Sequence, residues 1–440
     1  MSGLSLKEKL RELERVQNRA PSARPAKPQQ NNLAELLGGE ERDGCLTVER
    51  RYALHEAHGQ VRLADLLEIS GAAFGIAAKD GQLAAFDPRR AVFLDTETTG
   101  LAGGTGTLAF LVGLGYFENG DFVVRQYFLR GPQEESAMLA AVQQRMQQCS
   151  GLVTFNGKSF DVPLLLTRSV LNRLRPAFEA LPHIDVLHAA RRLWKPSLQD
   201  CSLGNLEYRI LGKTRSVDVP GAFIPALYFD FLRTGNTRSL PDIFAHNRQD
   251  LVATAALLAH LGSLVQSPFK LRATAHELRQ IGKLYREAGE WETSGRLLQL
   301  LIENHAHERQ AEDYLALGFC YKVQRRDEEA RQIWQHMIDH LSFHPLPFIE
   351  LAKHLEHRAG DHQRAHDLVQ RALRAMALVE ELQPAHRSLF YRQDLLRRSA
   401  RLQGKLCHRS PHDQFPFMAK EISAEESFFT QIIEKERVLR

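Results

Sequence analysis

The sequence has few cysteines, no long apolar run and little excess charge. Its five cysteines are scattered among 440 residues and form no C-x-x-C pair, which argues against a disulfide framework or a zinc site and favours reduced thiols. No apolar run approaches the ~18 residues that a membrane-spanning helix needs. The N-terminal residues also lack the apolar core of a signal peptide. We therefore expect a cytoplasmic protein that does not associate with a membrane.

The net charge of +4 does not by itself indicate a nucleic-acid-binding protein. It does not exclude one, because a cluster of catalytic acids would mask a basic rim in the sum. Hydrophobic residues make up 43% of the chain and charged residues 25%, which is ordinary for a globular protein. The length suggests roughly two to four domains.

The most informative segment is residues 91–100, AVFLDTETTG. Its apolar start is typical of a strand that is buried on both faces, and Asp95 and Glu97, two residues apart, then point to the same side. The C-terminal ends of strands are where open α/β sheets bind their ligands. Two close carboxylates repel each other unless a cation neutralises them, and a hard ion such as Mg²⁺ or Mn²⁺ prefers oxygen ligands. The alternative, a strand that simply ends in solvent, stays open for this pair alone.

The rest of residues 91–265 has an α/β pattern. Two apolar segments, 108–117 and 122–128, flank an Asn-Gly pair and predict a hairpin. Short strands near 152–155 and 183–186 alternate with helices, and Pro241 opens a long helix that reaches about residue 261. This order predicts a mixed sheet with helices on both faces. The glycine-rich segment 103–107 lacks the spacing of a dinucleotide-binding loop.

Helical repeats are expected after the α/β segment. The small residues Ser294, Ala330 and Ala365 occupy equivalent positions in two-helix units, 36 and 35 residues apart. This spacing resembles the tetratricopeptide repeat, whose period is about 34 residues. A basic helix at 395–406 is interpreted as a cap on the stack, with a basic docking face as the alternative. We expect four regions: a partly disordered helical and linker region (1–40), a leader packed on the next domain (41–90), the α/β domain (91–265) and the repeats (270–440).

Two further motifs follow Asp95 and Glu97 in the chain. A short strand leads into Asn156 and then Asp161, which opens a helix, with Phe160 before it expected to be buried. On the long helix, His246 and Asp250 lie four residues apart and share one face. Each motif alone could be an ordinary helix start or a solvated helix face. Their order along one α/β domain is what suggests a common site.

These acids resemble the three motifs of the DEDD exonuclease superfamily, which has a ribonuclease H-like fold. The resemblance covers about residues 93–261. Within the superfamily, segments 185–194, 218–221 and 246–250 are most similar to the YprB-type ribonuclease H-like proteins, which also carry tetratricopeptide repeats. One departure concerns His246. It stands four residues before the last aspartate, a spacing at which superfamily members place a tyrosine, whereas a catalytic histidine usually stands five residues before it.

The resemblance implies a metal-dependent 3′→5′ exonuclease acting on single-stranded DNA or RNA. Two divalent ions, Mg²⁺ or Mn²⁺, would be held by Asp95, Glu97, Asp161 and Asp250, with His246 as general base. The residues expected to contact the substrate are Thr98, Thr99, Asn156, Lys158, Arg191 and Arg192. The helical repeats would bind a partner protein or guide the strand. The alternative is a non-catalytic nucleic-acid-binding adaptor whose repeats recruit a partner. The sequence does not distinguish DNA from RNA.

Overall fold

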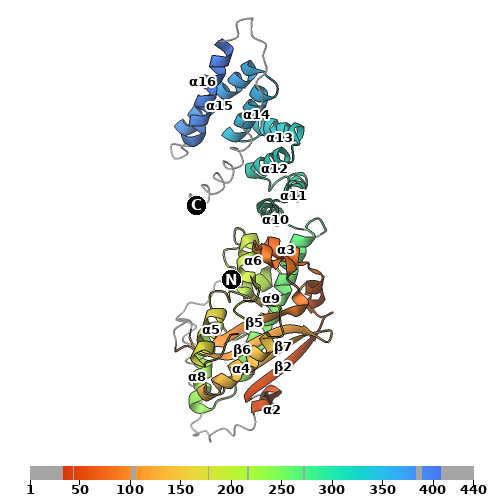
Figure 1. Ribbon diagram of the computed structural model, residues 1–440, viewed down its shortest axis with the longest axis vertical. Helices are drawn as coiled ribbons and strands as arrows, with labels where there is room; N and C mark the ends of the chain where they lie inside the picture. The colour runs from red at the N-terminus through yellow and green to blue at the C-terminus, as the bar shows by residue number, and fades with distance from the viewer. Residues whose placement is uncertain are drawn as a thin grey trace. The chain divides into compact units, whose positions relative to one another are not determined.

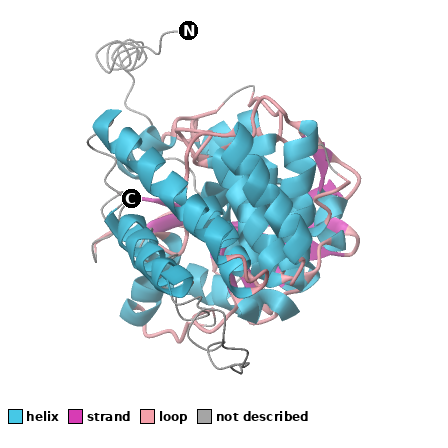
Figure 2. Ribbon diagram, turned by 90° about the horizontal axis from the view of Figure 1, so that it is seen from above, coloured by secondary structure: helices cyan, strands magenta, loops and turns pink. Residues whose placement is uncertain are grey.

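The computed structural model describes residues 33–42, 44–100, 106–176, 178–215, 218–270, 273–382 and 389–407 (Figure 1). The chain divides into two compact units, Met1–Gln324 and Arg325–Arg440. The helix expected at 4–17 and the linker expected at 21–32 lie outside the described residues. Across the described ranges, no helix is both long enough and apolar enough to cross a bilayer. Figure 2 colours helices and strands separately. Among the described residues, all strands lie in the first unit, and the regular elements of the second unit are helices.

A seven-stranded mixed sheet, in the order β1-β2-β7-β6-β5-β8-β9, organises the first unit. The central strand β5 pairs antiparallel with β6 and parallel with β8, and β9 continues the parallel half. Strands β6 and β7 form the hairpin expected around Asn119 and Gly120, where both residues have positive φ. The strands of this central part are β5 (Ala91–Thr98), β6 (Ala109–Glu118), β7 (Asp121–Phe128), β8 (Gly151–Thr154) and β9 (His183–Asp185). The expected mixed sheet is confirmed.

Helices cover both faces of this sheet, as the pattern of β5 requires. Ala91 and Phe93 belong to a core that contains most of helix α9 (Leu240–Gln266). Val92 and Leu94 belong to a second core that contains α4 (Glu135–Met146) and α8 (Ile224–Thr234). The other helices around the sheet are α5 (Asp161–Leu171), α6 (Val186–Trp194), α7 (Leu203–Arg209) and the short η4 (Pro88–Arg90), η5 (Pro132–Glu134) and η6 (Gly221–Phe223).

The leader extends the sheet, which its sequence did not indicate. Strand β2 (Cys45–Ala53) pairs antiparallel with β7 from Leu46 opposite Phe128 to Ala53 opposite Asp121. Only the first four residues of β2 are buried, so the strand shows no period of two in its apolar residues. The other leader elements are the hairpin β3 (Ala57–His58) and β4 (Val61–Arg62), η2 (Leu63–Glu68), α3 (Gly71–Ala78) and η3 (Gly81–Ala85), and α2 (Leu33–Leu37) and β1 (Gly39–Arg42) precede β2.

The first helices after the α/β segment pack on it. The indole of Trp194 donates to Glu277 Oε1 at 2.9 Å, and His276 Nε2 lies 2.8 Å from the carbonyl oxygen of Leu193. In α10 and α11, Gly282 and Ser294 allow a close approach, and Ser294 Oγ donates to the Gly282 carbonyl at 2.8 Å. The helices of this region are α10 (Ala275–Glu287), α11 (Trp291–Asn304) and α12 (Ala311–Val323). The boundary expected at 265–270 and the tetratricopeptide character stay predictions.

The second unit is helical. Its helices are α13 (Asp327–His340), α14 (Pro345–His357), α15 (His362–Leu382) and α16 (Leu389–Cys407). Glu356, only 3% exposed, accepts hydrogen bonds from Arg398 at 2.9 Å, from Arg401 at 2.8 and 2.9 Å, and from Lys405 at 2.8 Å. Because one buried carboxylate engages these three basic side chains of α16, the structure favours the capping-helix interpretation over the basic docking face.

We predict that a chain ending after Gln324 folds, whereas one ending after Gln266 does not fold stably. Five buried residues of α10 and α11 belong to the core beneath α9, namely Leu278, Ile281, Leu284, Leu297 and Leu301. Burial of each side chain stabilises the fold by roughly 1.5–3 kcal/mol, whereas the net free energy of unfolding of a domain is only about 5–15 kcal/mol. Loss of all five would therefore remove most of that stability. Gel filtration and thermal unfolding followed by circular dichroism test this. A soluble chain of residues 1–266 that melts with the full-length transition would contradict it.

Glu356 should make the second unit sensitive to acid. Burial alone would raise the pKa of Glu356, but the hydrogen bonds from Arg401 and Lys405 outweigh it and lower the pKa from 4.5 to about 2. As the pH falls, Glu356 therefore becomes protonated in the unfolded chain before it does so in the folded protein. The stabilisation of about 3 kcal/mol is present above pH ~4.5 and is lost as the pH falls toward ~2. Urea unfolding across this range should show that loss in the wild type and a flatter profile in Glu356→Gln. Parallel profiles for the two proteins would refute the assignment.

Candidate functional site

Asp95 is fixed by helix α9. Asn247 Nδ2 donates to Asp95 Oδ2 at 2.7 Å. The amide oxygen of Asn247 accepts from Gln126 Nε2 at 2.8 Å, and the same Gln126 amide donates to the carbonyl oxygen of Phe244 at 2.9 Å. Gly113 of β6 pairs with Asp95, and a Cβ at this glycine would lie 2.3 Å from Asn247 Oδ1. The helix can therefore reach the acid only because residue 113 has no side chain.

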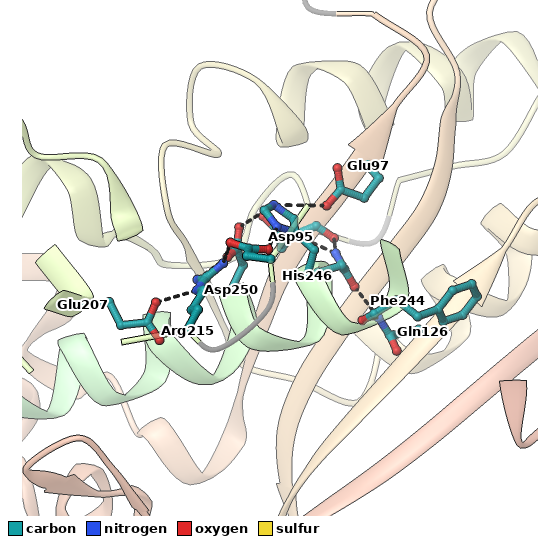
Figure 3. Close-up of polar contacts among 10 residues, drawn as sticks. Asp95, Glu97, Gln126, Glu207, Arg215, Phe244, His246 and Asp250 are labelled. Atoms are coloured by element: carbon teal, nitrogen blue, oxygen red, sulfur yellow. Dashed lines mark hydrogen bonds and ion pairs between the residues drawn. The ribbon is translucent and has the colours of Figure 1, made fainter. Parts of the chain in front are cut away.

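The acids of β5 face His246 and Asp250. Figure 3 shows the imidazole of His246 between Glu97 and Asp250, with Nε2 at 3.9 Å from Glu97 Oε1 and 3.6 Å from Asp250 Oδ2. All three side chains are largely buried, with exposed fractions of 12–19%. The period of two in β5 places Asp95 and Glu97 on one side of the strand, and the one-turn spacing in α9 places His246 and Asp250 opposite them.

Asp161 joins them from the opposite side of β5. It is the first residue of α5, is buried, and accepts a hydrogen bond from the hydroxyl of Thr96, which lies between Asp95 and Glu97 in the strand. The residue before it differs from expectation. Phe160 is 55% exposed, so the prediction that it is buried is wrong. The backbone at Phe160 is the turn into α5, and this turn directs Asp161 inward and the phenyl ring outward.

Burial and neighbouring charges disfavour the charged forms of these four carboxylates. Burial raises the pKa of Asp95 and of Glu97 well above the usual range, and the charges of Asp250 and Asp161 raise both further. Burial raises the pKa of Asp161 to about 6, although the hydrogen bond from Thr96 opposes the shift. Burial also raises the pKa of Asp250, while His246 and Arg215 counter it. Such a cluster is stabilised by an added cation.

The donor set suits a hard divalent ion, which takes oxygen ligands. Asp95 and Asp250 each accept a hydrogen bond within the protein on one carboxylate oxygen, Oδ2 and Oδ1 respectively, so their other oxygens could bind a cation. In the part of the chain that the structure describes, no three His, Cys, Asp or Glu side chains are already gathered closely enough to hold a metal ion. Binding a cation would therefore draw the carboxylates closer together.

Asp218 and Arg215 are among the site residues that the sequence did not identify. Asp218 Oδ1 lies 2.5 Å from His246 Nδ1, and Arg215 donates to Asp218 Oδ2 at 2.9 Å and to Asp250 Oδ1 at 2.6 Å. Asp218 stands in a segment that supported only the family resemblance, and no local pattern marked Arg215. Both act through contacts with residues far away in the sequence, which periodicity does not reveal.

A cleft of about 550 Å³ opens beside these acids. Asp95 and Asp250 contribute to its wall, and the basic side chains of Arg191 and Lys195, at the end of α6, also line it. The full lining is Asp95, Phe155, Asn156, Leu187, Arg191, Lys195, Gln199, Asp200, Cys201, Ser202, Leu203 and Asp250. Acids and bases therefore share one concave surface, as expected for a site that binds a phosphate-bearing substrate near a cation.

Of the other residues expected to contact the substrate, Asn156 lines the cleft and the rest do not. The backbone N–H of Asn156 donates to the buried Asp185 at 2.8 Å. Lys158 is exposed, and Arg192 donates to the carbonyl of Ala77 at 3.3 Å, toward α3. The hydroxyl of Thr98 donates to the Gly100 carbonyl at 2.9 Å, and that of Thr99 accepts from the N–H of Leu108 at 2.9 Å. Both threonine hydroxyls thus stabilise the backbone beside the site.

Comparison with known proteins agrees with this architecture. The profile of the RNase H superfamily matches residues 92–262, which hold the central strands and all four carboxylates. The chain is also 32% identical over 346 residues to "Uncharacterized protein YprB" of Bacillus subtilis (strain 168), and this similarity covers 77% of the chain and 82% of that protein. The superfamily implies a nuclease-type function, a nucleic-acid substrate and, typically, divalent metal ions. The chain therefore belongs to the RNase H superfamily, in one family with YprB.

Proposed function

We propose that this protein is a metal-dependent 3′→5′ exonuclease that hydrolyses the phosphodiester bonds of single-stranded DNA or RNA. The observation that carries the proposal is the convergence of Asp95, Glu97, Asp161 and Asp250, from β5, α5 and α9, beside a cleft with basic residues in its wall. The order and spacing of these acids support the DEDD set. The 3′→5′ polarity and the preference for single strands rest on the resemblance to that superfamily.

The four carboxylates would hold two divalent ions, Mg²⁺ or Mn²⁺. When bound, these ions supply electrostatic stabilisation of the charge that develops on the phosphate oxygens during in-line displacement. Arg191 and Lys195 in the cleft wall would bind neighbouring phosphates, and Asn156 would contact the terminal nucleotide. The repeats would form a tetratricopeptide-like stack that binds a partner protein, and the α/β domain would be residues 91–265.

His246 would act as the general base. The carboxylate of Asp218 only accepts hydrogen bonds, so the imidazole proton is assigned to Nδ1 and the lone pair to Nε2. Nε2 faces the Glu97 and Asp250 side, where the attacking water must lie. Asp218 would hold the ring in this orientation and stabilise its protonated form after proton transfer. In this proposal Nε2 of His246 accepts the proton, although His246 stands four residues before Asp250, where other superfamily members have a tyrosine.

Replacement of Asp95 should greatly slow hydrolysis and leave the fold intact. Asp95→Asn keeps an acceptor for Asn247 and removes one of four repelling charges, so stability should hold or rise. Several kcal/mol of transition-state stabilisation would be lost, or roughly 10³-fold in rate. The assay uses single-stranded DNA and RNA, labelled at either end, with and without Mn²⁺. The matched control is Asp121→Asn on the same sheet, which should behave as wild type.

The same assay distinguishes the adaptor. Wild-type protein should shorten 5′-labelled strands progressively from the 3′ end and release mononucleotides. Binding of the strand without any Mn²⁺-dependent cleavage would favour a non-catalytic adaptor instead. Cleavage that Asp95→Asn leaves unchanged would eliminate the assignment of the four carboxylates.

His246 should affect turnover much more than metal binding. An imidazole adds little to a site of oxygen ligands for a hard ion, so the Mn²⁺ affinity of His246→Ala should stay within a few-fold of wild type. Loss of general-base assistance should lower kcat by about 10²–10⁴-fold. His246→Tyr should retain more activity than His246→Ala, because tyrosine at this spacing reproduces the arrangement of the tyrosine members. Single-turnover rates and calorimetric Mn²⁺ titration measure both effects. An alanine variant as fast as wild type would remove His246 from the reaction.

A further inference from the structure

Arg215 connects the acids of the site to a second layer of charged residues. Its guanidinium makes three ion pairs, at 2.6 Å to Asp250, at 2.9 Å to Asp218 and at 2.7 Å to Glu207. The Arg215 side chain is 11% exposed and that of Glu207 only 1%. Figure 3 shows Arg215 between Glu207 and Asp250. A planar guanidinium offers its donors in fixed directions, so three simultaneous partners fix its orientation.

Glu207 is held in turn by the leader. His58, in the hairpin of β3 and β4, places Nε2 at 2.6 Å from Glu207 Oε1. Gln60 of the same hairpin binds the segment that follows α7. Its backbone N–H donates to the Leu211 carbonyl at 2.9 Å, and its side chain donates to the Ile210 carbonyl at 2.7 Å. A continuous chain of polar contacts thus runs from the leader to Asp250.

Gly59 makes this close contact possible. Its φ is +65°, a conformation that favours glycine, and a Cβ at this position would lie 2.0 Å from the carbonyl oxygen of Leu211. Any larger residue must push the hairpin away from α7. The position of the hairpin against α7 therefore depends on the absence of a side chain at Gly59.

We propose that the hairpin formed by β3 (Ala57–His58) and β4 (Val61–Arg62) positions the nuclease site through Glu207 and Arg215. Glu207 orients Arg215, and Arg215 sets the carboxylate of Asp250 and the Asp218 that holds His246. The inference rests on the proposed function and gives the leader a role in it. Arg215, Glu207 and His58 are positioning residues, since the group that each holds lies between it and the reacting atoms.

The alternative is that these contacts only attach the leader to the domain. A purely structural network would alter stability without altering the site. A positioning network should alter metal affinity and turnover, and loss of such outer partners typically costs 10–100-fold in either. Substrate affinity should change little, because the residues of this network other than Asp250 lie outside the cleft lining.

The test compares Glu207→Gln and Gly59→Ala with Asp313→Asn. Asp313 is 1% exposed and pairs with Arg279 at 2.6 Å, so its replacement also removes one buried ion pair of the first unit, among the helices that follow the α/β segment. For each full-length variant, kcat and KM on a single-stranded oligonucleotide, the Mn²⁺ dissociation constant by calorimetry and the melting temperature are measured. Arg215→Lys, which keeps the charge but loses the planar fork, is the conservative variant.

The expected result is a 10–100-fold loss in kcat or Mn²⁺ affinity for Glu207→Gln and Gly59→Ala, with KM within about two-fold. Arg215→Lys should show an intermediate loss, and Asp313→Asn should lower only the melting temperature. If both test variants lose stability as the control does but keep wild-type kcat and Mn²⁺ affinity, the positioning role is wrong while the nuclease assignment stands. A wild-type protein that neither binds Mn²⁺ nor cleaves would overturn the proposed function, and this inference with it.

Discussion

Repulsion among largely buried carboxylates is the constraint on which the architecture of this site depends. Burial raises the pKa of all four acids, and the charges of Asp161 and Asp250 raise those of Asp95 and Glu97 further. A fold gains no stability from such a cluster, and the proposed binding of divalent cations would account for its presence. The surrounding residues keep the arrangement tolerable through specific hydrogen bonds and one buried arginine, Arg215.

Three of the four acids accept a hydrogen bond from a different part of the chain. Asn247 of α9 holds Asp95, Thr96 of β5 holds Asp161, and Arg215 holds Asp250. These supports exist only where backbone elements approach closely. Gly113 lets α9 lie against β6, and Gly59 lets the leader hairpin lie against α7. The absence of a side chain at these two positions thus permits both close approaches.

The sequence predicts the parts of this site that local periodicity determines. The period of two in β5 places Asp95 and Glu97 on one side, and the one-turn spacing in α9 places His246 over Asp250. Pairings between distant segments have no such signal. Strand β2 shows no alternation of apolar and polar residues, because only its first four residues are buried. The sequence does not mark Arg215 and Asp218 as site residues, because their partners come from other elements. The sequence allows Phe160 to be buried before Asp161, whereas the structure exposes its ring at the turn into α5.

The central claim is that these four carboxylates form one cation site. Anomalous diffraction from crystals of the wild-type protein soaked in Mn²⁺ tests it most directly, because the signal locates the ions without any assumption about activity. The account predicts anomalous peaks between the carboxylates of Asp95, Glu97, Asp161 and Asp250, and their loss in Asp95→Asn crystals. Strong peaks elsewhere, with no density among these four side chains at saturating Mn²⁺, would contradict it.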